Sequence, residues 1–310
     1  MIARSYLYVP GDAPGKLAKV LGRGADAVIV DLEDAVPPAG KDAARAGVRA
    51  WLAELSGVDT EIWVRVNPGS LGHRDVRAVL TPAAGALAAE ATATGATAVT
   101  GATAVTGATA VTGVMAAKTE SADELAALDG VLAECEAATG LAAGSVRVVP
   151  LLESAAAVLR ATEIAQAARV ERLQLGEADL AADIGITVGP DERELDHVRS
   201  QIVLVSAAAG INPPVAPVST NFRDLDALRE STRALARRGF LGRACIHPAQ
   251  VAVVNEVFTP SPDEVDAARD LVARFEAAVA DGSGVVLSAD GRMVDEAVVR
   301  QARRALDRGL

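Results

Sequence analysis

RSYLYVPGDAPGKLAKVLGRGADAVIVDLEDAV, residues 4–36, predicts a β-strand, a Pro-Gly turn, a helix and a second strand. The second predicted strand is apolar and continues directly into Asp31, Glu33 and Asp34. Three acids at the end of a buried strand repel one another unless an opposite charge lies nearby. We therefore expect a cationic side chain or a bound cation at the carboxyl end of this strand.

The same alternation of β-branched runs with Ala- and Leu-rich amphipathic segments continues along almost the whole chain. This pattern is typical of a parallel sheet with crossover helices. Eight such units predict a (β/α)8 TIM barrel, a fold whose sites form at the carboxyl ends of the strands. The predicted strands are residues 6–9, 27–31, 62–66, 114–118, 146–152, 172–175, 211–215 and 243–246, of which 211–215 is the weakest.

Length and composition favour a folded protein that binds small molecules. The chain has 310 residues, of which 50% are hydrophobic, enough for a sizeable core. A formal net charge of -11 and a pI near 4.9 argue against nucleic acid or an anionic membrane as a partner, since both would repel the chain. The two cysteines cannot form a disulfide framework, and residues 1–9 do not resemble an export signal. We expect a cytoplasmic protein.

A low-complexity segment interrupts the alternating pattern. The hexapeptide GATAVT occurs three times in tandem between Gly95 and Thr112. A period of six residues suits neither an α-helix nor a solenoid with so few copies. We interpret residues of about 83–113 as an expanded surface loop, with a lid or a partner surface as the alternatives.

The last 50 or so residues depart from the alternation of strands and helices. A capped helix, a hairpin turning at Asp290-Gly291 and a final helix over about 295–306 are predicted there. This unit is too small to hold a large core by itself, so we expect it to pack on the barrel or on a neighbouring subunit. We assign residues 1–255 to the barrel and 256–310 to a C-terminal cap.

Two acids at the ends of consecutive predicted strands are candidate metal ligands. Glu153 lies in PLLES and Asp179 in GEADLAAD, and neighbouring strands lie about 4.8 Å apart. Two carboxylates would leave an octahedral Mg2+ with positions for water and substrate oxygens. The alternative is structural, because each acid also lies near a helix start, where capping and the helix dipole favour a negative charge.

Arg65 and Lys118 are candidate cations at the same edge. The Arg65 guanidinium lies at the end of an apolar strand, where it would bind an oxyanion or form a salt bridge with Asp31 or Glu33. Lys118 allows the same two interpretations, with the structural one favoured. The sequence lacks GxSxG and HExxH, and it has no dinucleotide fingerprint between a strand and a helix.

Taken together, these motifs resemble the HpcH/HpaI aldolase and citrate lyase β-subunit family, in particular its CoA-ester lyases such as malyl-CoA and citramalyl-CoA lyases. The resemblance covers nearly the whole chain. The segments that carry it, in order, are RSYLYVPG, GADAVIVDLEDAV, VRVN, KTES, LLES, GEADLAADIG and GRACIHPAQ, and DGRMVDEAVVRQA resembles the cap of the longer members.

The resemblance implies a Mg2+-dependent, reversible carbon-carbon cleavage of a 3-hydroxyacyl-CoA to acetyl-CoA and a 2-oxo acid, glyoxylate or pyruvate. Glu153 and Asp179 match the family's metal ligands, which place the cation against the carboxylate and carbonyl of the 2-oxo acid. Arg65 matches the active-site arginine that stabilises the moving oxyanion charge. Asp31 and Glu33 match an acidic motif that we expect to orient Arg65 and metal-bound water.

The C-terminal cap carries the remaining implied role. Asp295 matches the cap aspartate that an adjacent subunit delivers and that deprotonates the methyl group of acetyl-CoA in the synthetic direction. From its surroundings in the sequence alone, Asp295 would be an ordinary helix N-cap. A cap that reaches a neighbouring subunit needs a closed ring, and members of the family form trimers or multiples of trimers.

Tyr8 and Lys19 match positions that contact CoA in the family. The chain has Ala13 where members often have an arginine after the first Pro-Gly, and Lys16 is a candidate replacement for that phosphate contact. Two other functions stay open: a citrate lyase β-subunit that acts on a citryl-acyl carrier protein, and a barrel that binds acyl-CoA without catalysing a reaction.

Overall fold

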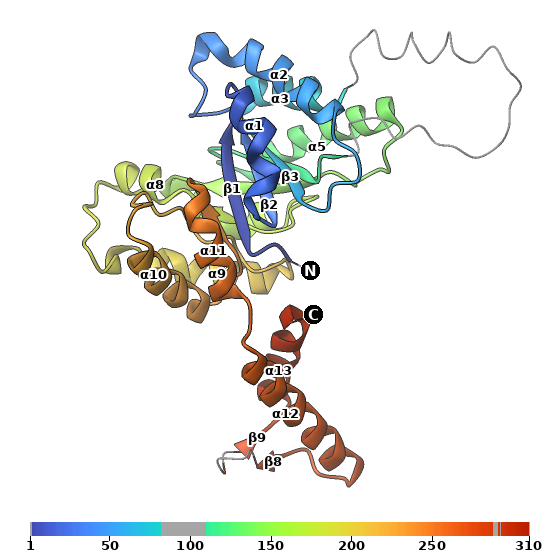
Figure 1. The fold of residues 1–310 in the computed structure, drawn as a ribbon, viewed down its shortest axis with the longest axis vertical. Helices are drawn as coiled ribbons and strands as arrows, with labels where there is room; N and C mark the ends of the chain where they lie inside the picture. Colours follow the sequence, from blue (N-terminus) through green and yellow to red (C-terminus); the bar gives the residue numbers. More distant parts are fainter. Residues whose placement is uncertain (1, 82–109, 288–290, 292, 310) are drawn as a thin grey trace, which may run out of the picture.

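The computed structural model describes residues 2–81, 110–287, 291 and 293–309 (Figure 1). Most of the predicted insert, with most of the GATAVT repeats, lies outside these residues. At its end, the Ile62 N–H donates to the Thr112 hydroxyl at 3.1 Å, and the Thr112 N–H donates to the Ile62 carbonyl at 2.8 Å. The last threonine of the third repeat therefore already belongs to the sheet.

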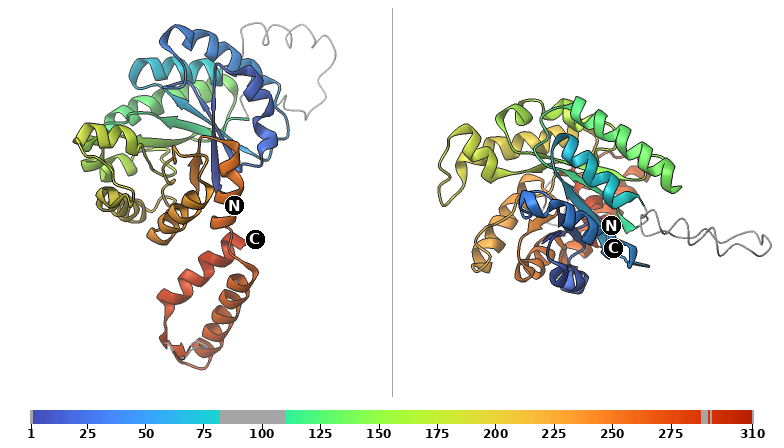
Figure 2. Two further views of the ribbon diagram at one scale, coloured as in Figure 1. Left: turned by 60° about the vertical axis from the view of Figure 1, so that its left-hand side comes forward. Right: turned by 90° about the horizontal axis from the view of Figure 1, so that it is seen from above.

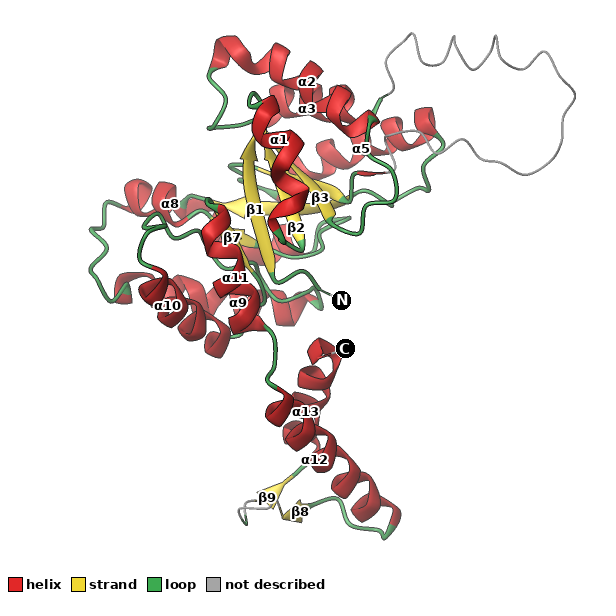
Figure 3. Cartoon of the chain, viewed as in Figure 1, coloured by secondary structure: helices red, strands yellow, loops and turns green. Residues whose placement is uncertain are grey.

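Seven parallel strands form one curled sheet (Figure 3). Their order across the sheet is β6-β5-β4-β3-β2-β1-β7, so consecutive strands are neighbours and the first strand pairs with the last. The strands are β1 Ser5–Pro10, β2 Ala27–Asp31, β3 Glu61–Val66, β4 Gly113–Ala116, β5 Arg147–Leu152, β6 Gln174–Leu175 and β7 Arg243–Cys245. This α/β architecture is consistent with a TIM-barrel-like fold.

The weakest predicted strand, residues 211–215, forms single bridges instead of a strand. Val215 forms one parallel bridge to Gln174 of β6, and Ala216 forms one to Arg243 of β7. The segment contains Pro213 and Pro214, and proline has no N–H to give to a sheet ladder. The missing N–H groups of the two prolines therefore limit this segment to two bridging residues between the edge strands β6 and β7.

The helices lie on the outside of the curled sheet (Figure 2). Alternate residues of each strand face opposite sides, so Val28 and Val30 pack under the helices while Ala27 and Ile29 pack inside the curl. The helices are α1 Pro14–Val20, α2 Lys41–Ala53, α3 Gly69–Leu80, α5 Ala122–Thr139, α6 Ala155–Leu159, α7 Ala161–Ala165, α8 Glu177–Ile184, α9 Asp196–Ala209, α10 Leu225–Arg238 and α11 Pro248–Phe258. No helix in the described part of the chain is long and apolar enough to cross a membrane.

The C-terminal segment forms the predicted helix, hairpin and helix. It comprises α12 Pro262–Ala280, the antiparallel strands β8 Val286–Leu287 and β9 Met293–Val294, and α13 Glu296–Gly309. We call residues 262–309 the C-terminal hairpin and residues 2–258 the body. The predicted division after residue 255 falls within α11, which runs to Phe258. Figures 1 and 2 show the hairpin projecting away from the body.

Candidate active site

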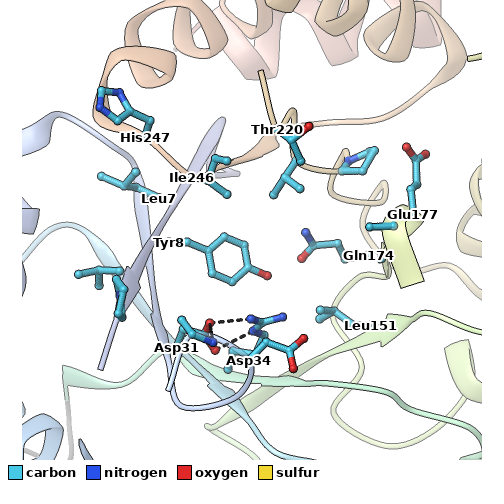
Figure 4. Close-up of a pocket in the computed structure, with 18 of the residues that line it drawn as sticks. Leu7, Tyr8, Asp31, Asp34, Leu151, Gln174, Glu177, Thr220, Ile246 and His247 are labelled. Atoms are coloured by element: carbon cyan, nitrogen blue, oxygen red, sulfur yellow. Dashed lines mark hydrogen bonds and ion pairs between the residues drawn. The ribbon is translucent and has the colours of Figure 1, made fainter. Parts of the chain in front are cut away.

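A cavity of about 1090 Å³ opens at the carboxyl ends of the strands. Tyr8 of β1 and Asp31 of β2 line it (Figure 4). Arg65 of β3 and Glu153 after β5 line it as well. The side chains converge because parallel strands end at one edge of the sheet. The structure therefore gathers most of the predicted site residues in one place.

Arg65 provides the counter-charge for the acids that follow β2. Its Nε and Nη2 donate to the two carboxylate oxygens of Asp31 at 2.8 and 2.6 Å, and Nη1 lies 3.2 Å from Oε2 of Glu33. Its guanidinium carbon also lies 5.1 Å from the centre of the Tyr8 ring. Burial alone would lower the pKa of Arg65, but the hydrogen bonds to Asp31, together with the electrostatic effects of Tyr8, Asp31 and Glu33, raise it overall. Arg65 is therefore a fixed cation at the base of the cavity.

Lys118 joins the acidic loop to the candidate metal ligands. Its Nζ lies 2.5 Å from Glu33, 3.1 Å from Asp34 and 3.4 Å from Asp179. The backbone of Lys118 has a φ of +50°, a left-handed conformation that is uncommon for a residue with a side chain. This conformation accompanies a bend at which the Lys118 N–H faces Glu153 at 3.4 Å. Lys118 is thus a positioning residue for three acids.

Glu153 and Asp179 lie side by side, as predicted. Glu153 is 6% exposed and is in hydrogen-bonding range of the Asp179 carboxyl group. Burial, and then the proximity of Asp179, raise the pKa of Glu153 to about 8. Gly176 makes room for this arrangement, because a Cβ at position 176 would lie 2.5 Å from Cγ of Glu153. The pair is electrostatically costly unless a proton or a cation lies between the carboxyl groups.

These two carboxyl groups fit a hard divalent cation. Within the described residues, no group of three or more His, Cys, Asp or Glu side chains is arranged to hold a metal ion. A cation at this place would therefore use two carboxylates and fill its other positions with water and substrate oxygens. Mg2+ is commonly held in enzymes by this kind of donor set.

Basic side chains from one helix line the outer part of the cavity. Lys16 and Lys19 of α1 and the following Arg23 all contribute to its wall. The three are spaced by three and four residues and so lie on one face of the helical segment. Lys16, the candidate replacement for the arginine that family members often have at the position of Ala13, thus lies in the cavity wall.

Two predicted site residues do not line this cavity: Glu33, which contacts Arg65 and Lys118 beside it, and Asp295, which lies in the C-terminal hairpin. Asp295 is the one with no contact to the other site residues that the structure describes. It precedes α13, and its Oδ1 accepts hydrogen bonds from Ala297 N at 2.9 Å and Val298 N at 3.2 Å. Within one chain it acts as a helix N-cap and is not part of the cavity wall. Its catalytic role thus stays a prediction that depends on a second copy of the chain.

Two residues of the cavity were not singled out as site residues from the sequence. Asp34 belongs to the acidic motif, but only the fold shows that it pairs with Lys118. Gln174 lines the cavity from β6 and is 2% exposed. A signal for Gln174 was present in the alternation of RLQL, which places Arg172 and Gln174 on one face of the strand and two leucines on the other.

A model of the HpcH/HpaI aldolase/citrate lyase family matches residues 4–106 and 99–248. The chain belongs to this family. Among curated relatives, citrate lyase subunit beta of Leuconostoc mesenteroides subsp. cremoris is 30% identical and the match covers 98% of this chain and 92% of the relative. The L-malyl-CoA/beta-methylmalyl-CoA lyase of Cereibacter sphaeroides is also 30% identical, with 96% and 92% covered. A (3S)-malyl-CoA thioesterase of that organism is 29% identical, with 98% and 93% covered.

Solved structures of the HpcH/HpaI aldolase/citrate lyase family agree with this assignment. CitE from Mycobacterium tuberculosis, in complex with magnesium, acetoacetate and coenzyme A, matches with a TM-score of 0.72 at 29% identity, covering 98% of this chain and 97% of CitE. The citrate lyase beta subunit from the same organism, with oxaloacetate and magnesium, matches with a TM-score of 0.62 at 29% identity, covering 83% and 97%. The family resemblance predicted from the motifs is confirmed.

Proposed function

We propose that this protein is a Mg2+-dependent lyase that reversibly cleaves a 3-hydroxyacyl-CoA, such as malyl-CoA or citramalyl-CoA, to acetyl-CoA and glyoxylate or pyruvate. The observation that carries the proposal is the convergence of Arg65, Glu153 and Asp179 on one cavity. The Arg65 guanidinium can stabilise negative charge on a substrate oxygen, and the carboxyl groups of Glu153 and Asp179 can hold a cation beside it. Carbon-carbon cleavage needs both, because negative charge moves between oxygen atoms during the reaction.

Glu153 and Asp179 are the residues that would hold the Mg2+ ion. When bound, the ion supplies Lewis-acid polarisation of the carbonyl of the 2-oxo acid. Its presence would also remove the electrostatic cost of the paired carboxyl groups. Relatives of known structure contain magnesium together with small oxo acids, which supports this part of the proposal.

Arg65 would stabilise the oxyanion that forms and disappears during carbon-carbon bond cleavage. Asp31 occupies two of its five N–H groups, which leaves donors for the substrate. Asp31 and Glu33 fix the direction of the guanidinium and so lower the cost of ordering it when the substrate binds. These two acids are therefore positioning residues.

The CoA moiety would enter along α1. Lys19 and Lys16 offer positive charge to the phosphates of CoA. Tyr8 lies deeper, against Arg65, where it would contact the acyl end of the thioester. A phosphate-rich ligand at this edge also agrees with the coenzyme A bound in the structure of CitE.

Asp295 would act as the base on acetyl-CoA in the cavity of a neighbouring subunit. We infer a body that closes as an eight-stranded barrel through Val215 and Ala216, and a C-terminal hairpin that caps the cavity of another copy. The position of Asp295 outside its own cavity supports delivery between subunits. A ring of three subunits would satisfy this geometry, because each hairpin then serves the next copy.

The test begins with the two thioesters themselves. Purified protein is incubated with malyl-CoA or citramalyl-CoA with and without Mg2+, and the products are separated by chromatography. We expect acetyl-CoA with glyoxylate or pyruvate, and loss of both products after chelation of Mg2+. Free CoA with malate or citramalate would instead show thioester hydrolysis, as in the related malyl-CoA thioesterase. The absence of any cleavage, with CoA still bound, would favour a silent acyl-CoA-binding barrel.

A second candidate function is that of a citrate lyase β-subunit acting on a citryl-acyl carrier protein. The 30% identity to citrate lyase subunit beta over 98% of the chain favours it. Incubation with a citryl-acyl carrier protein and with citryl-CoA separates the two functions. A preference for the carrier protein would replace the CoA-ester proposal.

A further inference from the structure

Lys41 places a cation against the backbone of the acidic loop, residues 31–36, which follows β2. Its Nζ donates to the carbonyl oxygens of Leu32 and Glu33, both at 2.9 Å, and to Oδ1 of Asn67 at 2.7 Å. These bonds match the three protons of an ammonium group, and all of them go to neutral oxygens. Lys41 itself does not line the cavity. The carboxylates of the loop therefore remain available to the cations of the site.

Asn67, which follows β3, connects the acidic loop to the neighbouring helices. Its Nδ2 donates to the Leu32 carbonyl at 2.8 Å and to Oδ2 of Asp75 at 2.7 Å, and its backbone N–H donates to the same Asp75 oxygen at 2.8 Å. Asp75 is fully buried on α3, and its Oδ1 accepts a hydrogen bond from Nε of Arg45 on α2 at 2.6 Å. Both ends of the Asn67 amide are thus bonded, and Lys41 is the donor to its oxygen.

The acidic loop carries the side chain that contacts both cations of the site. The Glu33 carboxylate lies 3.2 Å from Nη1 of Arg65 and 2.5 Å from Nζ of Lys118. Within the loop, the Glu33 N–H donates to Oδ1 of Asp31 at 2.9 Å, and the Asp34 N–H donates to Oε2 of Glu33 at 2.8 Å. The bond to the Glu33 carbonyl therefore also limits where the Glu33 carboxylate can lie relative to the two cations.

The stability of α2 does not account for a lysine at position 41. Lys41 is the first residue of α2, and the preceding Gly40 has no side chain to cap the helix. The helix dipole disfavours a positive charge at this end and favours an acid. An amide side chain would avoid the charge, but it has two protons for three acceptors. The contacts of Lys41 with the loop and with Asn67 are thus what a lysine gains at this position.

We propose that Lys41 is a positioning residue for catalysis: it fixes the backbone of the acidic loop and thereby holds Glu33 where it orients Arg65 and Lys118. This inference rests on the proposed lyase function. A cation that is oriented in advance stabilises oxyanion charge without reorganisation during the reaction, and a displacement of about 1 Å can cost about a hundredfold in rate. Loss of Lys41 should therefore slow the chemical step and leave the binding of the CoA part largely unchanged.

Lys41→Met keeps a side chain of similar length and removes all three donors. In the cleavage assay with malyl-CoA and citramalyl-CoA at saturating Mg2+, we expect kcat to fall at least about tenfold, with KM for the thioester changed by less than about threefold. Lys41→Gln, which keeps two donor protons, should lose less. Leu52→Ala is the matched control, because Leu52 is buried about three turns further along α2. This variant should lose stability and keep kcat.

Hydrogen exchange of the ligand-free protein gives a second measurement that does not depend on turnover. The N–H groups of Glu33 and Asp34 are bonded to carboxylates inside the acidic loop, so they exchange when the loop opens. Mass spectrometry of peptides that cover residues 31–36 follows this opening. We expect exchange to be at least about tenfold faster in Lys41→Met and unchanged in Leu52→Ala.

A kcat within roughly twofold of the wild type in folded Lys41→Met would overturn the inference. So would equal losses of kcat in Lys41→Met and Leu52→Ala, because reduced stability would then be the cause. Failure of the lyase proposal gives a different pattern, in which the wild type itself cleaves neither thioester. The exchange measurement still decides in that case: unchanged exchange of the loop in Lys41→Met overturns the role of Lys41, and selectively faster exchange supports it.

Discussion

Acids in the body and acids in the C-terminal hairpin lie in opposite settings. In the body, the side chains of Asp31 and Glu33 are 4% and 5% exposed and are held by Arg65 and Lys118. In the hairpin, Asp266 and Glu276 are 73% and 61% exposed, and their ion pairs with arginines lie in water. Exposed pairs of this kind contribute little to stability, whereas the buried ones fix the geometry of the cavity.

The body and the C-terminal hairpin also differ in how many apolar side chains they bury. Strands and helices of the body bury a continuous core, while the hairpin has a small cluster around Phe275, Val294 and Val299. Leu287 and Met293 of the hairpin remain 63% and 67% exposed. The body buries a large core within one chain and still exposes Leu159 and Leu204 at 81% and 71%, whereas the hairpin has only a small core, and its exposed apolar side chains fit the proposed contact with another copy.

Removal of a candidate metal ligand should have the largest effect. We expect Asp179→Asn to lower kcat/KM by about 10⁴-fold, since loss of Lewis-acid catalysis is worth several kcal/mol. The residual activity should no longer depend on Mg2+, as measured by titrating the ion in the cleavage assay. Glu163→Gln, an exposed acid on α7, is the matched control and should retain full activity. Full Mg2+-dependent activity in Asp179→Asn would place the ion elsewhere.

Asp295→Asn tests whether the hairpin takes part in catalysis at all. We expect condensation to fall by about 10³-fold, as for loss of a general base, with 2-oxo acid binding unchanged by calorimetry. Glu296→Gln, the next residue along the chain, is the control.

Co-expression of Asp179→Asn and Asp295→Asn chains then distinguishes action within one chain from action between chains. In a closed ring with random mixing, roughly a quarter of the sites would combine an intact metal site with an intact hairpin from the neighbour. Recovery of activity to about that fraction supports delivery between subunits. If mixed and separate preparations are equally inactive, Asp295 does not act across an interface.

The affinity for Mg2+ should depend on pH through Glu153. Burial raises the pKa of this group to about 8, so the protein at pH 6 or 7 holds a proton that must leave before the carboxylate can bind a cation. We expect the Kd for Mg2+ to fall about tenfold per unit between pH 6 and 7 and to level off near pH 8. Calorimetry over this range checks it, and Asp295→Asn should show the same profile. A flat profile would mean that Glu153 is already ionised without the metal.

The strands and most of the cavity follow from local sequence patterns. The strand over Ala27–Asp31 was predicted with its observed bounds, because a run of buried β-branched residues ends at a charge. The pairing of Arg65 with Asp31 was one of two alternatives that the sequence left open. The fold selects it, since β2 and β3 place the two residues in register. Register is thus what the sequence alone could not supply.

Other parts of the site depend on contacts that no local pattern encodes. Lys118 meets Glu33 and Asp34 across 85 and 84 residues of chain, so its partners emerge only when the sheet curls. The Gln174 side-chain oxygen accepts no hydrogen bond from a described residue, and this is a property of its neighbours and not of its own strand. For Asp295 the sequence suggested both an N-cap and a base, and a single chain displays only the N-cap.

The smallest effects are those on the stability of the metal-free protein. A substitution at Glu153 in the body should raise the free energy of unfolding, and one at Asp295 in the hairpin should lower it. The raised pKa of Glu153 means that the folded protein keeps a proton that the unfolded chain has lost, so stability falls as the pH rises from about 4.5 to about 8. Glu153→Gln removes this cost and should add up to about 4 kcal/mol to the free energy of unfolding at pH 8, but little at pH 4.5. Asp295→Ala removes an N-cap and should subtract about 1 kcal/mol from the stability of the hairpin. Urea denaturation of the metal-free variants at both pH values measures these changes. If Glu153→Gln is less stable than the wild type at pH 8, the Glu153 carboxyl group contributes to folding and is not held at a cost for binding.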